Sequence, residues 1–396
     1  MQLTTKEVTF LADVFKDHNV LSPFRNIETQ LDGSEQQSLV DKGIISNGAY
    51  TPDALKVFET IAKPDRYSSI LLLSGYATIK KYTYKKGDII ILAENLNDDL
   101  RFSEPENWDE ALYSFSEFLG TSSLLNIRVK VKLAIDELLL LAAIVDIYRK
   151  NTLAGYIEKA SPIKSISVEE IKKELKANYK NGLLRLIAAN FELKKPDPEQ
   201  VEQIIVALIE KKCLEKAEGY KLTDSYTIFA RNYLIPHTQV LLESFRFING
   251  QELAAARYLA IAAGVHDIIG FWFNGKEFEM ETVNAFFLLN MIETYLNCPD
   301  MEDSPGALAP KTQEHDAEEK AEAISPPPVK PVKHTVPPVQ RPQNWFMQKG
   351  GQQYGPYSWQ QLRSFIAEKR LMPDDLVWSE SLHQWTRAGS VPDLFN

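Results

Sequence analysis

The chain has 396 residues, of which 44% are hydrophobic and 25% charged, with a formal net charge of −10. This composition is typical of a soluble globular protein, and the length predicts two or three domains. A net acidic chain without a basic tract disfavours general nucleic-acid binding. The two cysteines, Cys213 and Cys298, lie too far apart to indicate a disulfide framework or a metal site.

The amino terminus and the longest apolar run of the sequence both bear on localisation. The first residues, Met1 to Glu7, contain neither the basic nor the apolar region of a secretory signal. The most apolar run, Leu138 to Val145, is much shorter than the roughly 20 residues that cross a bilayer. The sequence therefore predicts a cytoplasmic protein without a membrane span, and a buried helix around Leu138.

Residues 1–125 are predicted to form a first α+β unit. A helix from Leu3 to Phe15, with Thr4 or Thr5 as N-cap, opens it. The patterns that follow predict, in chain order, an amphipathic helix ending near Ile45, a second helix from Leu55 to Ile61, strands at Ser69–Leu73, Thr78–Tyr84 and Asp88–Leu92, and a helix at Trp108–Leu119.

Residues 126–298 repeat that order and are predicted to form a second, related unit. The segment Ala207–Leu214 resembles Ser38–Ile45, and a Tyr follows each of them, Tyr220 and Tyr50. The expected elements are a helix at Leu133–Tyr148, an inserted helical stretch at Ser167–Leu193, strands at Val240–Phe247, Ala255–Ala262, Asp267–Phe273 and Glu277–Val283, and a helix at Ala285–Leu296. The sequence thus predicts a duplicated body with small sheets.

The order helix, helix, short loop, aromatic strand, helix is typical of a winged-helix unit. A helix that reads DNA should expose several basic and amide side chains. The two candidate recognition helices offer Glu35, Gln36, Gln37, Asp41 and Lys42, and Glu202, Gln203, Glu210, Lys211 and Lys212. Because acids equal or exceed bases, a scaffold for packing or protein binding is favoured, and a nucleic-acid-binding regulator is the alternative.

Residues 299–343 are predicted to be a disordered linker. Its first part is acidic, and Ser325 to Pro342 is basic and rich in proline. Such a stretch buries too little apolar surface to offset its ordering entropy, and its prolines favour the polyproline II conformation.

Catalytic motifs are lacking. None of the six histidines lies near a second His or Cys at a metal-ligand spacing, and the chain has no phosphate-binding, dinucleotide-binding or nucleophile-elbow motif. We therefore expect a protein that is not an enzyme, with no metal, no catalytic residue and no cofactor.

Residues 344–396 are predicted to form a small α+β domain with an aromatic core. They hold four of the chain's six tryptophans. The local patterns predict a strand at Asn344–Gln348, a helix capped by Ser358 with Leu362, Phe365 and Ile366 on its apolar face, and a buried strand at Leu376–Trp378.

This segment resembles the bacterial GYF-like family (the GYF_2 type). The resemblance rests on the first Trp, a Gly-Pro-aromatic before a capped helix, a Leu-Val-Trp strand and a later Trp before a Pro-x-Leu ending. Trp345 stands at the family's first Trp and Gly355-Pro-Tyr357 at its Gly-Pro-Phe. Met347, Leu362 and Phe365 replace a usual Tyr, Met and Trp, and the family's Gly-Tyr-Phe falls on Lys369 to Leu371, so it is missing.

The resemblance implies an adaptor that holds proline-rich peptides on aromatic side chains. The implied partner is a protein or a proline-rich peptide, because polyproline II is already extended and loses little entropy on binding. The candidate peptide-binding residues are Trp345, Tyr354, Pro356, Tyr357, Trp359 and Trp385. The candidate ligand within the chain comprises Pro326, Pro327, Pro328, Pro331, Pro337 and Pro338.

A further alternative concerns the body. The run from Leu3 to Leu92 is faintly similar to the cytosolic chaperones of type VII secretion, which are also duplicated. That resemblance implies a secreted helical-hairpin partner.

Overall fold

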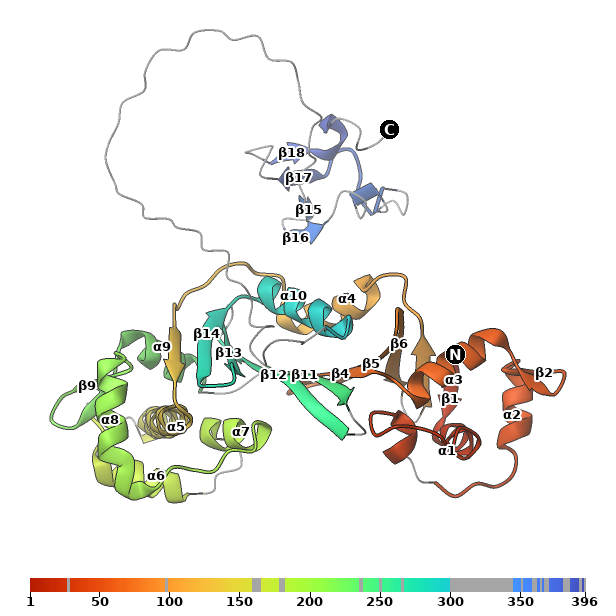
Figure 1. Cartoon of the computed structure of the whole chain (residues 1–396). Helices are drawn as coiled ribbons and strands as arrows, with labels where there is room; N and C mark the ends of the chain where they lie inside the picture. Colours follow the sequence, from red (N-terminus) through yellow and green to blue (C-terminus); the bar gives the residue numbers. More distant parts are fainter. Residues whose placement is uncertain are drawn as a thin grey trace, which may run out of the picture. The chain divides into compact units, whose positions relative to one another are not determined.

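The computed structural model describes residues 1–26, 29–96, 99–158, 165–177, 182–234, 238–248, 251–264, 267–299, 345–349, 352–357, 362–363, 365–366, 370–379, 385–391 and 394. The chain divides into two compact units, Met1–Thr312 and Gln313–Asn396, which are described separately (Figure 1). Apart from Pro299, the predicted disordered linker lies outside the described residues.

One 10-stranded antiparallel sheet organises the large unit. Its first-half strands are β1 (Gln2–Thr4), β4 (Arg66–Ser74), β5 (Thr78–Lys86), β6 (Ile89–Leu96) and β7 (Asp99–Ser103). Its second-half strands are β8 (Lys130–Leu133), β11 (Thr238–Ile248), β12 (Gln251–Ala263), β13 (Asp267–Phe273) and β14 (Phe278–Val283). The order is β1-β7-β6-β5-β4-β11-β12-β13-β14-β8, so the second half mirrors the first.

The prediction of small sheets is wrong because β4 and β11 pair at the centre. Their register runs from Ser74 opposite Thr238 to Arg66 opposite Arg246, and it joins the two predicted units into one sheet. The edges are also equivalent: β1 precedes the first helix and pairs with β7, while β8 precedes α5 and pairs with β14.

The helices follow the same repeated order. The first half contains α1 (Thr5–Val14), η1 (Pro23–Asn26), α2 (Glu35–Asp41), the hairpin β2–β3 (Ile45–Ser46 and Ala49–Tyr50), α3 (Pro52–Ala62) and α4 (Asp109–Leu119). The second half contains α5 (Ile135–Glu158), α6 (Val168–Lys176), α7 (Leu183–Asn190), η2 (Pro198–Gln200), α8 (Val201–Glu210), the hairpin β9–β10 (Leu214–Lys216 and Tyr220–Leu222), α9 (Asp224–Asn232) and α10 (Ala285–Leu296). Helices α6 and α7 are the inserted stretch.

Two layers of helices cover the sheet (Figure 1). Helices α4 and α10 pack side by side over the central strands. Every second residue of β4, such as Ile70 and Leu72, packs against them. On the other face, α1–α3 pack against β5–β7, and α5–α9 pack against β12–β14. This arrangement follows from the alternation of side chains along each strand.

The apolar run Leu138–Val145 is buried within α5, as predicted. It forms part of the largest core and packs against α7, α8 and α9. Within the described ranges, no helix is long and apolar enough to cross a membrane.

Helix α1 begins at a capping box. Thr4 accepts from the backbone N–H of Glu7, and the Glu7 carboxylate accepts from the backbone N–H of Thr4. The same carboxylate accepts from Ser38 Oγ and from Lys42 Nζ at 2.7 Å, so it also ties α1 to α2. Burial alone raises the pKa of Glu7, but these hydrogen bonds outweigh burial and lower it.

The small unit has a four-stranded antiparallel sheet of order β16-β15-β17-β18. Its elements are β15 (Trp345–Lys349), β16 (Gln352–Tyr357), β17 (Leu376–Ser379), β18 (Thr386–Arg387) and η3 (Ala388–Ser390). Leu362, Arg363, Phe365 and Ile366 are helical. The unit is α+β, as the sequence predicts.

Candidate peptide-binding site

One face of the small sheet packs into the hydrophobic core of the unit. Trp345 and Met347 of β15 both lie on this face, and Val377 of β17, the cross-strand partner of Met347, packs with them. Trp345 is only 2% exposed and Leu362 is fully buried. The structure therefore places the first predicted binding residue, Trp345, inside the core of the unit.

A second group of aromatic side chains lies at the margin of this core. The rings of Tyr357 and Phe365 meet edge to face, with centroids 4.8 Å apart and an interplanar angle of 86°. Both are half-buried and pack against the core, and the Arg370 guanidinium lies 4.5 Å from the Phe365 centroid. The Tyr357 and Phe365 rings are thus held by packing yet keep part of their surface accessible. Trp385 is also half-buried, but it precedes Thr386, the cross-strand partner of Val377, so the alternation of side chains places it beside Trp378 and away from this margin.

The opposite face of the sheet carries a third aromatic group. Phe346 and Trp378 are cross-strand partners on β15 and β17, and their ring centroids lie 5.6 Å apart at 58°. Both are half-buried, and neither belongs to the core nor to the described side chains that pack against it.

The expectation of a wholly buried strand at Leu376–Trp378 is wrong. Val377 and Ser379 are buried, whereas Leu376 and Trp378 are half-buried. Successive side chains of a strand point to opposite faces, so only every second residue of β17 reaches the core.

Acidic and basic side chains border this outer face. Arg387, the cross-strand partner of Leu376, lies 3.8 Å from Asp374, and both side chains are largely exposed. Asp375 Oδ2 accepts from the backbone N–H of Met372 at 2.8 Å, which fixes the turn before β17.

The remaining predicted site residues are less fully described. Tyr354 and Pro356 lie on β16, but their side chains are outside the described residues, as are Trp359 and all the prolines of the candidate internal ligand. Sequence reasoning missed Phe346 and the outward placement of Trp378. The signal was available in the alternation Trp345-Phe346-Met347, once Trp345 is taken as a core residue.

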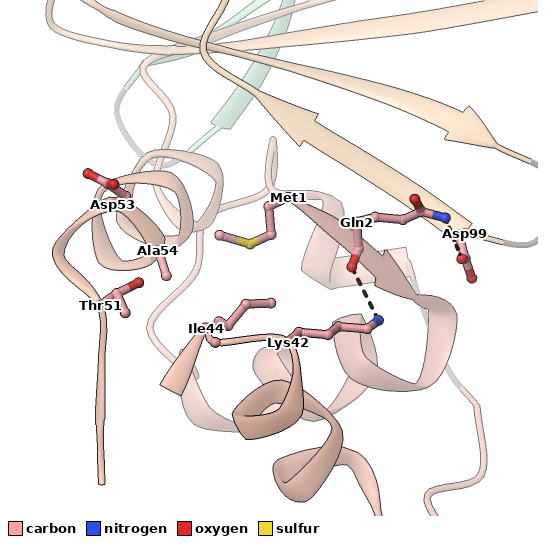
Figure 2. A pocket seen from close by; sticks show the side chains of 9 residues that line it. Met1, Gln2, Lys42, Ile44, Thr51, Asp53, Ala54 and Asp99 are labelled. Atoms are coloured by element: carbon pink, nitrogen blue, oxygen red, sulfur yellow. Dashed lines mark hydrogen bonds between the residues drawn. The ribbon is translucent and has the colours of Figure 1, made fainter. Parts of the chain in front are cut away.

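A surface pocket of about 460 Å³ lies elsewhere, in the large unit (Figure 2). Met1 and the first residue of the edge strand β1, Gln2, line it together with Lys42, Ile44 and Asp53 from the helical cluster. Lys42 Nζ donates to Gln2 O at 3.2 Å, and the α-amino group of Met1 donates to Phe102 O at 2.7 Å. Burial, and next Arg101, lower the pKa of that amino group. The hydrogen bonds of Lys42 and of the α-amino group thus hold the edge strand β1 in place.

Possible metal ligands are the last group of side chains to consider in the described part of the chain. No cluster of three or more His, Cys, Asp or Glu side chains there is arranged to hold an ion.

Among solved structures, the chain is similar to the Mycobacterium tuberculosis type VII secretion system chaperone EspG5, solved in complex with the PE25–PPE41 dimer, with 10% identity and a TM-score of 0.42 over 75% of this chain and 94% of that chain. None of the curated proteins matches the chain. Residues 345–394 match the family described as GYF domain 2, which confirms the resemblance seen in the sequence of the carboxyl-terminal unit.

Proposed function

We propose that the protein is a non-catalytic cytoplasmic adaptor whose carboxyl-terminal unit binds proline-rich segments. The match to GYF domain 2 indicates a protein–protein interaction module. The observation that carries the more specific proposal is the margin of half-buried rings formed by Tyr357 and Phe365.

These rings suit an extended, proline-rich ligand. The edge-to-face contact of Tyr357 with Phe365 and the Arg370 guanidinium fix the rings before a ligand arrives. Rings already held by packing lose little side-chain entropy on binding, and polyproline II loses little backbone entropy. The recognition role of Trp345, Tyr354, Pro356 and Trp359 is part of this proposal, with Trp345 acting from within the core.

The test uses the full-length chain with its internal competitor removed. Pro326, Pro327, Pro328, Pro331, Pro337 and Pro338 are replaced by Ala, and a peptide of residues 325–342 is titrated while tryptophan fluorescence and calorimetric heat are followed. We expect saturable binding that weakens about tenfold or more when Tyr357→Ala and Trp385→Ala are combined in one variant, since aromatic anchors dominate such sites. Tyr76→Ala, at a side chain of the large unit that is 99% exposed, is the matched control. Absence of binding at millimolar peptide overturns the proposal.

A nucleic-acid-binding regulator is the second candidate. It is favoured by the helix–hairpin–helix order of α2, β2–β3 and α3, repeated in α8, β9–β10 and α9, which is compatible with a winged-helix arrangement. The charges oppose it, because α2 carries Glu35 and Asp41 and α8 carries Glu202 and Glu210. Salt-sensitive binding of duplex DNA to the full-length chain would support this function over a protein scaffold.

A secretion chaperone is the third candidate. The repeated order of elements in the large unit fits it. Co-purification of the full-length chain with a secreted helical-hairpin protein would support it, and loss of that association in the chain without residues 1–298 would assign it to the large unit.

A further inference from the structure

We infer that the outer face of the small sheet, formed by Phe346, Gln348, Leu376 and Trp378, is the docking surface for the chain's own proline-rich segment, residues 325–342. The inference rests on the proposed function, because it assumes a module that binds proline-rich chain. It assigns the internal ligand to the face opposite the Tyr357–Phe365 margin.

The geometry of the face is that of a shallow aromatic platform. Phe346 and Trp378 face each other across β15 and β17, and Gln348 and Leu376 are the next outward pair of the same register. All four side chains are half-buried. The two rings are fixed 5.6 Å apart by their strands. A tilted pair of this kind presents flat apolar surface against which proline rings pack.

The position of the pair in the chain selects the occupant. Phe346 lies at the start of β15, and Trp378 is its partner near the end of the antiparallel β17. The pair therefore sits at the end of the sheet where the chain enters from Pro342. Four residue steps separate Pro342 from Phe346, so their Cα atoms are at most about 15 Å apart. A segment tethered this closely has an effective concentration of the order of millimolar, which makes even weak stacking sufficient.

The chemistry of the segment matches the face. Residues 325–342 contain Lys330, Lys333 and Arg341 and no acidic residue. The turn that leads into β17 carries Asp374 and Asp375, at the Leu376 end of the platform, and Arg387 lies 3.8 Å from Asp374. A basic segment that runs along the platform from the Phe346–Trp378 end therefore meets this acidic turn. Pro328 and Pro331, three residues apart, fall on the same side of a polyproline II helix, which has three residues per turn.

The experiment places a nitroxide on the segment and monitors each tryptophan in the full-length chain. Thr335→Cys is spin-labelled, and tryptophans carrying ¹⁹F are assigned by single Trp→Phe substitutions. The native cysteines are fully buried and do not compete for the label. We expect the Trp378 signal to broaden several-fold more than the signal of Trp345, which lies on the core face as the cross-strand partner of Tyr357, independently of protein concentration. Phe346→Ala, or replacement of the six prolines by Ala, should abolish the difference while leaving the other tryptophan shifts unchanged.

Each other outcome overturns the inference in a distinguishable way. Broadening at Trp345 alone supports the proposed function but assigns the segment to the Tyr357–Phe365 margin rather than to the outer face. Broadening at Trp378 that grows with protein concentration identifies a second copy's segment as the occupant. No broadening at either ring, together with no peptide binding, removes both the inference and the proposed function.

Discussion

The indole N–H of Trp108 donates a hydrogen bond of 2.9 Å to Oδ1 of Asn297. Trp108 is the N-cap of α4 and Asn297 is the C-cap of α10, so the bond connects the start of one covering helix to the end of the other. The two residues belong to different halves of the large unit. The helical layer over the central strands is therefore joined by a side-chain contact as well as by packing.

This contact should show measurable coupling between the halves. Trp108→Phe and Asn297→Ala should each lower the free energy of unfolding by about 0.5–1.5 kcal/mol. Asn297→Ala also removes a bond from Asn297 Nδ2 to Glu293 O, so a double-mutant cycle is needed. Urea unfolding of the four proteins measures the coupling, and strictly additive changes would show that the bond does not stabilise the fold.

A buried carboxylate should dominate the stability of the inserted helices. Asp146 of α5 accepts from the backbone N–H groups of Leu183 and Leu184 at 2.9 and 3.0 Å, at the start of α7. Asp146→Ala leaves both buried donors without an acceptor and should cost about 2–4 kcal/mol. Asp146→Asn keeps one acceptor and should cost less. Urea unfolding of both variants gives the comparison, and equal losses would contradict it.

The same residue should make stability depend on pH. Burial raises the pKa of Asp146, although the two backbone donors and Arg149 oppose it, and Glu174 adds to the increase. The folded chain thus binds a proton that the unfolded chain releases, so this group's contribution to stability falls as pH rises above the ordinary carboxyl range. The free energy of unfolding of the wild type minus that of Asp146→Asn should therefore decrease from weakly acidic to neutral pH. A constant difference would show that the folded pKa is ordinary.

Gly270 and Tyr258 approach each other closely in the sheet, so substitutions at the two positions should change stability in different directions. A Cβ at Gly270 of β13 would lie 2.0 Å from the hydroxyl oxygen of Tyr258. Gly270→Ala should therefore cost about 1–3 kcal/mol through overpacking. Tyr258→Phe removes a buried hydroxyl that has no hydrogen-bond partner in the described ranges, and should leave stability unchanged or raise it by about 1 kcal/mol. Thermal unfolding should show partial relief of the Gly270→Ala loss in the double variant.

The two thiols should be inert in the folded chain. Cys213 and Cys298 are both fully buried, and burial raises the pKa of each. Because the thiolate is the reactive form, a thiol reagent should label neither cysteine in native protein and both in denaturant. Rapid labelling of one cysteine without denaturant would show that the surrounding core opens.

The local elements were largely predictable from sequence, because they depend on periodicity. Helix α10 has the predicted bounds Ala285–Leu296, and Thr4 is the N-cap of α1. The edge strands β1 and β8 were missed because three or four residues give no readable alternation. The single sheet was missed because β4 and β11 carry no local sign of pairing across more than 160 residues.

The family of the carboxyl-terminal unit could be predicted from its sequence, but which of its aromatic rings are exposed could not. The motif order identified residues 345–394, and the model of that family matches them. Which rings face water depends on register, and Phe346 and Trp378 reach the outer face only because Trp345 and Val377 occupy the core. A sequence without its strand pairing leaves that choice open.

The central seam between β4 and β11 has a consequence during protein synthesis. Strand β4 leaves the ribosome with one edge unpaired, and its partner β11 is complete only about 170 residues later, roughly 10–30 s at typical elongation rates. Through that interval the nascent first half presents a nine-residue template for incorrect strand addition. A truncated chain that stops before β11 should therefore aggregate in cells.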